Sequence, residues 1–237
     1  MALTAQSIVK NATLILQDTT SIRWTAYEIV DWINAAQREI MVYRPDANPM
    51  TGNGTLALGT RQTLVGMPGI TNPIKLGDIK RNVAVTSTKQ TVRMVEREIL
   101  DVLPTGWHSL TPSINIVHFT FDEREPLVFY TYPPASALAQ LEIMYYAYPT
   151  DVPQPSGIDY SGVTGNIGVT DIYGNAILDY ILYRCYSKDS EYAGNVQRAG
   201  AHKAAFDSVM GIELKATIMN GPESNNPFNK NTFPKRS

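Results

Sequence analysis

The segment SIRWTAYEIVDWINAAQREIMVYRP, residues 21–45, decides the fold class of the start of the chain. Thr25 is a favourable N-cap residue, and Glu28 three positions later completes a capping box in which two backbone donors are satisfied reciprocally. Arg44 and Pro45 end the segment, because a residue before proline is pushed out of the α region. The apolar residues recur at helical spacing and form one stripe, namely Ile29, Ile33, Ala36, Ile40 and Tyr43. The segment is therefore predicted to be an amphipathic helix.

Further helices are predicted on either side of the central part of the chain. Residues 3–17 place apolar side chains on one face, and the short polar turn that follows favours an antiparallel pair with the helix described above. Residues 170–189 and 195–216 also show helical spacing. The segment 170–189 is apolar or amphipathic almost all round, so it is expected to be covered on more than one face.

The stretch between these helices is predicted to be a compact antiparallel β module. Glycine and proline crowd its first part and break it into short runs, and Gly52-Asn-Gly54 is interpreted as a turn. Strands are expected at residues 55–58, 62–65, 114–121, 127–132 and 138–148, with one or two more in 74–85. The best strand evidence begins at 114–121, where Val117, Phe119 and Phe121 point one way, and the last strand places Leu141, Ile143, Tyr145 and Ala147 on one side.

These patterns together predict an α+β fold, in which helices from both ends of the chain form a bundle and an antiparallel β domain is inserted between them. The expected parts are an N-terminal helical pair (1–48), the inserted β domain (49–150), a surface loop (151–169), a C-terminal helical pair that completes the bundle (170–216) and an extended C-terminal arm (217–237). The arm has no helical or strand period and three prolines, so alone it cannot bury enough surface to offset the entropy of ordering.

The composition narrows the possible functions. The 237 residues carry 20 Lys+Arg against 22 Asp+Glu, a net charge of −2. This balance argues against a protein that grips nucleic acid through a general basic surface, although it permits one that surrounds DNA without holding it. No signal peptide is apparent, and nowhere do about 18 apolar residues run together. We therefore expect no membrane span.

A search for catalytic motifs finds no P-loop, no nucleophile elbow and no H-E-x-x-H sequence. His108, His118 and His202 are too scattered to predict a metal site, and Cys185 is interpreted as a small buried thiol. We expect a protein that is not an enzyme and needs no cofactor or metal.

One acidic cluster stands out, formed by Asp122, Glu123 and Glu125. A carboxylate pair can do acid–base work when it is buried and the two pKa values are set apart. Here the cluster lies at a predicted hairpin tip, so a solvated turn is the favoured interpretation. In a ring of subunits, such a tip could face a lumen or a partner.

Tyrosines gather on the last two predicted strands, at positions 130, 132, 145, 146 and 148. They are compatible with a carbohydrate platform, with a nucleic-acid stacking face or with a protein interface, where tyrosine buries area and keeps a polar tip. The absence of interleaved basic residues makes nucleic-acid stacking the weakest of the three.

Several motifs in order carry a family resemblance: W-x-x-x-E-x-x-x-W-x-N-x-A-x-x-E-I from Trp24 to Ile40, Tyr43-Arg-Pro-Asp46, Gly59-Thr-Arg-Gln-Thr-Leu64, Tyr145-Tyr-Ala-Tyr-Pro149, Leu178-Asp-Tyr-Ile-Leu-Tyr-Arg184 and Asp189-Ser-Glu191. In this order they resemble the head-to-tail adaptor proteins of tailed bacteriophages, especially short-tailed ones, related to tail tubular protein A. The similarity covers residues 3–215. No single motif is diagnostic, and the order and spacing carry the resemblance.

The resemblance implies a structural virion protein at the head–tail interface, assembled in the cytoplasm of the bacterial host. It implies a ring, typically of twelve copies, that binds beneath the portal protein and continues the DNA channel toward the tail nozzle or tube protein, with tail fibres as a further partner. DNA would pass through the lumen without sequence-specific binding. A tail nozzle or tube-terminator subunit and a carbohydrate-binding module remain as alternatives.

Two groups of residues are candidates for assembly contacts. An arm that docks on the portal would use the aromatic and basic residues near the end of the sequence, namely Phe228, Lys230, Phe233, Pro234, Lys235 and Arg236. A frayed terminus is the alternative for this arm. Packing within the bundle or between subunits is expected from Trp24, Trp32, Tyr173, Tyr180 and Tyr183.

Overall fold

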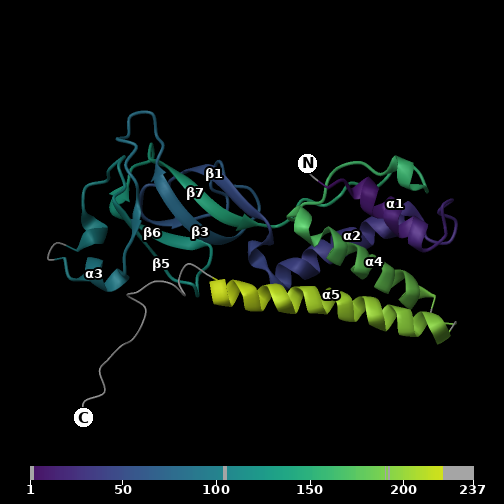
Figure 1. Ribbon diagram of the computed structural model, residues 1–237. Helices are drawn as coiled ribbons and strands as arrows, with labels where there is room; N and C mark the ends of the chain where they lie inside the picture. Colours follow the sequence, from purple (N-terminus) through teal and green to yellow (C-terminus); the bar gives the residue numbers. More distant parts are fainter. Residues whose placement is uncertain (1–2, 104–105, 190, 192, 221–237) are drawn as a thin grey trace, which may run out of the picture. The chain divides into compact units, whose positions relative to one another are not determined.

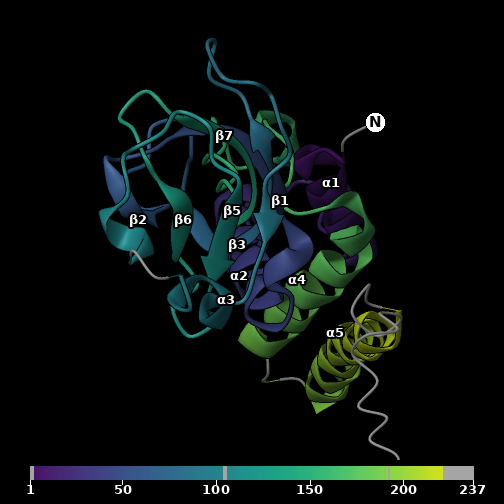
Figure 2. The same ribbon diagram turned by 90° about the vertical axis from the view of Figure 1, so that its left-hand side faces the viewer.

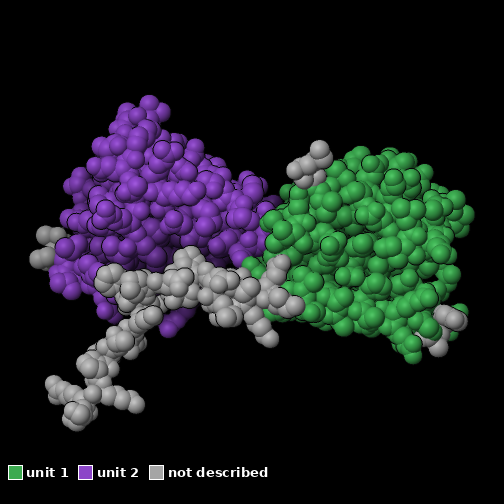
Figure 3. All heavy atoms as spheres, viewed as in Figure 1, with its two compact units in different colours: residues 1–44, 149–237 green, residues 45–148 purple. Residues whose placement is uncertain are grey.

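The computed structural model describes residues 3–103, 106–189, 191 and 193–220. The chain divides into two compact units, coloured separately in Figure 3. We call residues 1–44 and 149–237 the helical unit and residues 45–148 the β unit. The α+β fold predicted from the sequence, with terminal helices and an inserted, largely antiparallel β region, is confirmed.

Four α-helices form the described part of the helical unit (Figure 1): α1 (Ala5–Ile15), α2 (Ala26–Tyr43), α4 (Gly174–Lys188) and α5 (Ala193–Asn220). Helix α4 packs against each of the other three, and α5 runs alongside it. Residues on several sides of α4 are buried, including Ile177, Tyr180 and Cys185. The expectation that this helix is covered on more than one face is therefore confirmed.

The two ends of α2 lie where the sequence places them, but the predicted capping box forms only in part. Oγ1 of Thr25 accepts a hydrogen bond from N of Glu28 at 3.5 Å. The Glu28 carboxylate does not close the box, because its Oε1 accepts a hydrogen bond from Nζ of Lys188 at 2.5 Å. A charged ammonium is a stronger partner for a carboxylate than a backbone amide. Glu28 therefore links α2 to α4.

The C-terminal helices differ from their predicted bounds. The segment predicted as one helix over 170–189 begins with a 3-10 turn, η4 (Asp171–Tyr173), before α4 starts. Helix α5 is longer than the predicted 195–216 at both ends. Helix ends vary by a residue or two with the local hydrogen bonding. Helix α5 ends directly before Gly221 and Pro222, which are typical residues after a helix end.

Residues 149–169, which precede η4, contain one 3-10 turn, η3 (Tyr160–Gly162). Part of this predicted surface loop is buried, because Val152, Val163, Ile167 and Val169 pack inward. Its last part also bonds to the start of the chain, with N of Ala5 donating to O of Gly165 and N of Ile167 donating to O of Leu3.

The β unit contains two sheets, seen from the side in Figure 2. The three-stranded sheet has the order β1 (Pro49–Thr55), β7 (Gln140–Ala147), β3 (Pro73–Asn82). The four-stranded sheet has the order β2 (Gly59–Thr63), β6 (Val128–Ala135), β5 (His118–Phe121), β4 (Arg93–Met94). All neighbouring strands are antiparallel except β4 and β5. The short helix α3 (Arg97–Asp101) and the 3-10 turns η1 (Pro45–Ala47) and η2 (Trp107–Ser109) complete the unit.

The core of the β unit is built from alternating strand residues. Strand β7 buries every second side chain, from Leu141 to Ala147, as its sequence predicts. The remaining core includes Leu64, Leu76, Ile79, Ile116 and Phe129.

The first two strands were mispredicted. Strand β1 covers residues 49–55 and not 55–58, and β2 covers 59–63 and not 62–65. The glycines of β1, interpreted from the sequence as turn residues, permit a close approach of the chain that follows β2. A Cβ on Gly52 would lie 2.4 Å from O of Gly69, and one on Gly54 would lie 2.5 Å from Sδ of Met67. Glycine in a strand often marks such an approach.

The first and last strands of the β unit pair with each other. Pro49 lies opposite Tyr146 in the β1–β7 ladder, and Nδ2 of Asn48 donates to O of Ala147 at 3.2 Å. The two ends of the unit are therefore adjacent.

Candidate functional site

The acidic cluster predicted from the sequence lies in the turn that joins β5 to β6, and Asp122, Glu123 and Glu125 are all exposed. Oδ1 of Asp122 accepts a hydrogen bond from N of Arg124 at 2.9 Å, and its carbonyl oxygen accepts one from N of Glu125 at 3.0 Å. Glu123 faces Nζ of Lys75 at 3.4 Å. The turn is thus held by the carboxylate and the carbonyl oxygen of Asp122, and its acidic residues are exposed.

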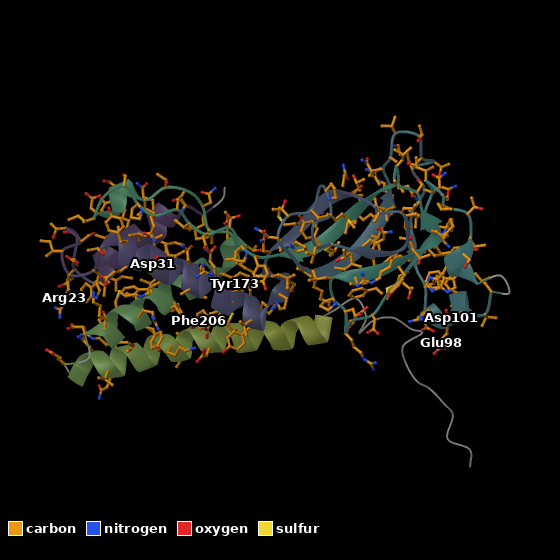
Figure 4. All side chains as sticks on the ribbon, turned by 180° about the vertical axis from the view of Figure 1, so that it is seen from behind. Arg23, Asp31, Glu98, Asp101, Tyr173 and Phe206 are labelled. Carbon is orange, nitrogen blue, oxygen red and sulfur yellow. The ribbon has the colours of Figure 1, made fainter. Side chains whose placement is uncertain are left out.

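This turn and the start of α3 together line a groove of about 610 Å³, which we call the acidic groove. Glu96 and Glu98 contribute two further carboxylates to it, and Figure 4 shows Glu98 and Asp101 on α3. The apolar and aromatic lining comes from β4, β5 and β6 and the residues next to them, namely Met94, Val95, Phe121, Val128 and Tyr130. The sequence did not predict the contribution of α3, which lies some 25 residues before the turn in the chain.

The acidic groove has an excess of negative charge. Its five carboxylates outnumber its two guanidinium groups, Arg97 and Arg124, and Nε of Arg97 lies 3.3 Å from Asp101. All five carboxylate residues are exposed. Carboxylates serve as catalytic acids when burial sets their pKa values apart, and these are not buried.

The groups that most often carry catalysis are dispersed in the described residues. Burial raises the pKa of the Cys185 thiol well above its ordinary value, so the reactive thiolate is disfavoured. The three histidines lie on separate elements, and Nδ1 of His202 is 2.9 Å from Asp179. No group of three or more His, Cys, Asp or Glu with metal-binding geometry occurs in the described part of the chain.

The aromatic residues predicted to make packing contacts fall into two sets. Trp24, Tyr173 and Tyr180 are buried in the helical unit of a single chain, and the ring of Tyr180 lies 5.3 Å from that of Phe206 on α5. Figure 4 shows Tyr173 and Phe206 among the helices. Trp32 and Tyr183 are only half-buried and keep part of their surface for a further contact.

Two buried polar residues of α2 form hydrogen bonds with the segment 149–169. They were not identified from the sequence. Nδ2 of Asn34 donates to O of Val152 at 3.0 Å, and Oδ1 of Asn34 accepts from N of Val152 at 2.8 Å. Gln37 donates to Oδ1 of Asn34 at 3.2 Å and accepts a hydrogen bond from N of Gly168. Asn34 occurs in the W-x-N-x-A motif, which was the only available signal.

The helical unit also exposes large apolar side chains that a single chain leaves uncovered, namely Ile22, Val42, Ile172 and Val196. Each is more than half exposed. A smaller cavity of about 210 Å³ lies between α2 and α5, lined by Tyr43, Asp207, Met210 and Gly211. These features give the helical unit apolar surface available for assembly.

The clustered tyrosines do not form one exposed face. Tyr130 and Tyr132 lie on β6 in the four-stranded sheet, whereas Tyr145 and Tyr146 lie on β7 in the other sheet. Tyr145 is buried, and its hydroxyl accepts a hydrogen bond from N of Thr71 at 3.1 Å. Burial, with a smaller contribution from Asp46, raises the pKa of Tyr146. The predicted tyrosine cluster is therefore divided between the two sheets.

The C-terminal arm was predicted to be extended from residue 217, but α5 continues to Asn220. The rest of the arm, including the docking candidates from Phe228 to Arg236, lies outside the described residues. Among the helices that are described, none is both long and apolar enough to span a bilayer.

Comparison with known proteins identifies one family. The chain matches the family model described as SU10 adaptor protein over residues 3–227. Comparison with curated proteins gives no match. Because the family model spans both units and all the described helices and strands, the chain belongs to the SU10 adaptor protein family and is a phage adaptor protein.

Proposed function

We propose that this protein forms a ring that docks on the portal of the phage head, joins it to the tail and forms part of the DNA channel. The observation that carries the proposal is the family match over residues 3–227, which includes every described element. The ring is expected to contain twelve copies, to contact the tail nozzle or tube protein on its far side and to form part of the virion.

The exposed apolar side chains of the helical unit support ring formation. Subunit interfaces are enriched in large apolar and aromatic residues at their centres, and uncovered apolar patches often mark such contacts. Val42 and Ile172 are 78% and 66% exposed. We assign the subunit contacts to such residues, together with the half-buried Trp32 and Tyr183. Trp24, Tyr173 and Tyr180 stabilise the subunit itself.

The charge balance supports passage of DNA without binding. A channel wall that neutralised many phosphates would release counterions and hold the DNA that has to slide through it. The net charge of −2 avoids this. In the proposed ring, the acidic turn with Asp122, Glu123 and Glu125 faces the lumen or a tail partner.

The portal contact is assigned to the C-terminal arm, with Phe228 and Phe233 as anchors and Lys230, Lys235 and Arg236 as charge contacts. Pro234 limits the conformations of the arm and so lowers the entropy lost on docking.

Sedimentation with the portal ring of the same phage tests the proposal. The full chain is expected to form a defined larger particle with the portal, and a chain truncated after Asn220 is expected not to bind. Binding of both would keep the adaptor role and remove the arm from it. If neither chain binds, a tail nozzle or tube-terminator role replaces the portal-facing one.

Ring closure is tested separately by a charge placed in the apolar surface. Val42→Asp combined with Ile172→Asp is expected to reduce ring formation on the portal, because an interface core excludes unpaired charge. Val85→Asp is the matched control, since Val85 is 94% exposed in the β unit. Equal loss with both variants would contradict the assignment of the helical surface.

A further inference from the structure

A second pocket of the β unit lies beside β4 and β5 and shares no lining residue with the acidic groove. It has a volume of about 380 Å³ and is lined by Gln90, Thr91, Arg93, Val117 and His118. Arg93 and His118 lie opposite each other in the parallel β4–β5 ladder, so both side chains project from the same face of the sheet. Four of these five side chains can donate hydrogen bonds. We call this site the donor pocket.

The donors of this pocket are not used by the described part of the chain. The Arg93 guanidinium forms no ion pair with any described residue, and the side chains of Gln90 and Thr91 form no hydrogen bond with one. All three residues are exposed, so a ligand can reach them. Polar groups that converge on a concave site without partners in the protein are typical of a ligand site.

The His118 ring gives independent evidence for a ligand. Its Nδ1 is buried and has no hydrogen-bond partner among the described residues. An N–H at that position would be buried without an acceptor, which is costly, so the neutral ring carries its proton on Nε2. The ring is stacked against Tyr132, with 6.1 Å between the ring centroids. Nε2 is therefore an oriented donor on the accessible edge of the ring, and it has no acceptor in the described chain.

A buried asparagine holds the two walls of the pocket in place. Nδ2 of Asn82 donates to O of Gln90 at 3.0 Å and to O of Ile116 at 2.8 Å. N of Asn82 also donates to O of Gln90 at 2.9 Å, and its Oδ1 accepts from N of Ile116 at 2.8 Å. These bonds join the segment that precedes β4 to the segment that precedes β5. A fixed arrangement of donors lowers the ordering cost when a ligand binds.

The surroundings of the pocket are positively charged. Residues 79–95 contain four basic side chains and no Asp or Glu. Lys80 and Arg81 share a single carboxylate within 4 Å, and Nζ of Lys89 donates to two backbone carbonyl oxygens. Among these four, Arg93 alone has no partner in the described residues. A local excess of positive charge attracts an anion.

We propose that the donor pocket binds a phosphate group, either free inorganic phosphate or a phosphodiester of a nucleic-acid strand. The planar guanidinium of Arg93 donates to two phosphate oxygens, and Nε2–H of His118 donates to another. The amide of Gln90 and the hydroxyl of Thr91 complete the set. A phosphate presents more acceptor oxygens than a carboxylate does, so it engages these converging donors together.

A single phosphate contact differs from the general basic surface that the net charge of −2 argues against. It also does not rest on the proposed ring or on the portal contact, because it can be measured on the free chain. Failure of the ring would leave the donor pocket unaffected, and failure of phosphate binding would leave the ring unaffected.

Titration of the full chain with inorganic phosphate tests the proposal. In proton–nitrogen NMR spectra, the side-chain signals of Arg93 and His118 are expected to shift in a saturable way, with a Kd of about 1–10 mM. The signals of the helical unit should stay unchanged. Absence of saturation up to about 50 mM phosphate would overturn the proposal.

Two variants separate the pocket from a general effect of charge. Arg93→Gln removes the two charge-assisted hydrogen bonds and should weaken phosphate binding about tenfold. Arg61→Gln is the matched control, because Arg61 is an exposed arginine on β2 of the same sheet, and it should leave the Kd within about twofold. Equal weakening by the two variants would overturn the assignment of the pocket.

A third variant tests the role of the imidazole. His118→Phe keeps an aromatic ring beside Tyr132 but removes Nε2–H, so phosphate binding should weaken about threefold to tenfold. The melting temperature should not fall, because the substitution also removes the unpartnered Nδ1. Unchanged phosphate binding in a folded His118→Phe chain would contradict the donor role of His118.

Two further ligands identify the source of the phosphate. A labelled thymidine oligonucleotide is titrated with the full chain and followed by fluorescence anisotropy. Binding that Arg93→Gln weakens and that inorganic phosphate displaces would assign the pocket to a phosphodiester, whereas phosphate binding without oligonucleotide binding would assign it to the free ion. Acetate binding as tight as phosphate binding would overturn the assignment to phosphate and indicate a carboxylate ligand.

Discussion

The β unit and the helical unit bury their cores in different ways. The β unit takes all its strands from one continuous stretch of chain, residues 45–148. The helical unit combines α1 and α2 from the start of the chain with α4 and α5 from its end. The information for the β core is therefore local to one segment, whereas the helical core exists only when two distant segments meet.

Both units use a buried asparagine to join backbone segments, and the comparison shows how far apart the joined segments are. In the β unit, Asn82 donates to O of Ile116 and accepts from its N, both at 2.8 Å. In the helical unit, Asn34 makes the same pair of bonds to Val152. The first pair spans 34 residues and the second spans 118, so the second cannot form before the β unit has been synthesised.

The largest expected difference between the units concerns independent folding. Residues 45–148 expressed alone should fold and unfold cooperatively, because every strand and the whole β core lie within that segment. Residues 149–220 alone should show no cooperative transition, since α4 loses the cover of α1 and α2. Near-ultraviolet circular dichroism during heating measures both, with the buried Trp107 as a probe in the β segment. A non-cooperative β segment would contradict the comparison.

Removing one buried aromatic side chain from the helical unit should have the next largest effect on stability. Phe206 is fully buried against Tyr180, and Phe206→Ala is expected to lower the free energy of unfolding of the helical unit by about 3–5 kcal/mol. Hydrogen exchange should speed up in α5 and stay unchanged in the β strands. Val196→Ala, at a position 55% exposed on the same helix, is the control and should cost under about 0.5 kcal/mol.

Removing one buried polar side chain from the β unit should have the third largest effect on stability. Asn82→Ala leaves N and O of Ile116 without their partner in a buried site, so we expect a loss of about 2–3 kcal/mol in the stability of the β unit alone. Chemical denaturation of the isolated 45–148 segment measures it. The control is Asn53→Ala, at an exposed position of β1. Similar losses for both variants would show that the bridge at Asn82 contributes little.

The smallest effect is expected at the helix cap. Thr25→Ala removes the acceptor for N of Glu28, and because that contact is long at 3.5 Å we expect the low end of the usual range, about 0.5–1 kcal/mol. The melting temperature of the helical unit should fall by a few degrees, while that of the β unit should not change. Thr20→Ala, at an exposed position before the helix, should leave both unchanged.

The features predicted well from the sequence are those that depend on neighbours along the chain. The start and end of α2 follow from Thr25 and Arg44, and the buried face of β7 follows from its alternation. The mistakes involve distant contacts. Gly52 and Gly54 were interpreted as turn residues because the loop that packs on them lies about 15 residues further along.

The candidate site shows the same limit. The turn with Asp122 and Glu125 was predicted as an acidic tip, but its groove also needs Glu96 and Glu98 from α3. No local pattern brings these segments together, since α3 has only five residues and lies on a separate stretch of the chain. The role of Asn34 could not be predicted for the same reason. Its partner Val152 follows the whole inserted unit in the sequence.

The pairing of Pro49 with Tyr146 has a consequence for how this architecture can change. Since the two ends of the β unit meet, the insert begins and ends at neighbouring points of the chain. This does not depend on which residues lie between those points. The entropy of closing a loop grows only with the logarithm of its length, and here strand pairing has already closed it. Domains of different size can therefore replace the insert without altering the helices, so this design lets the insert change independently of the helical unit.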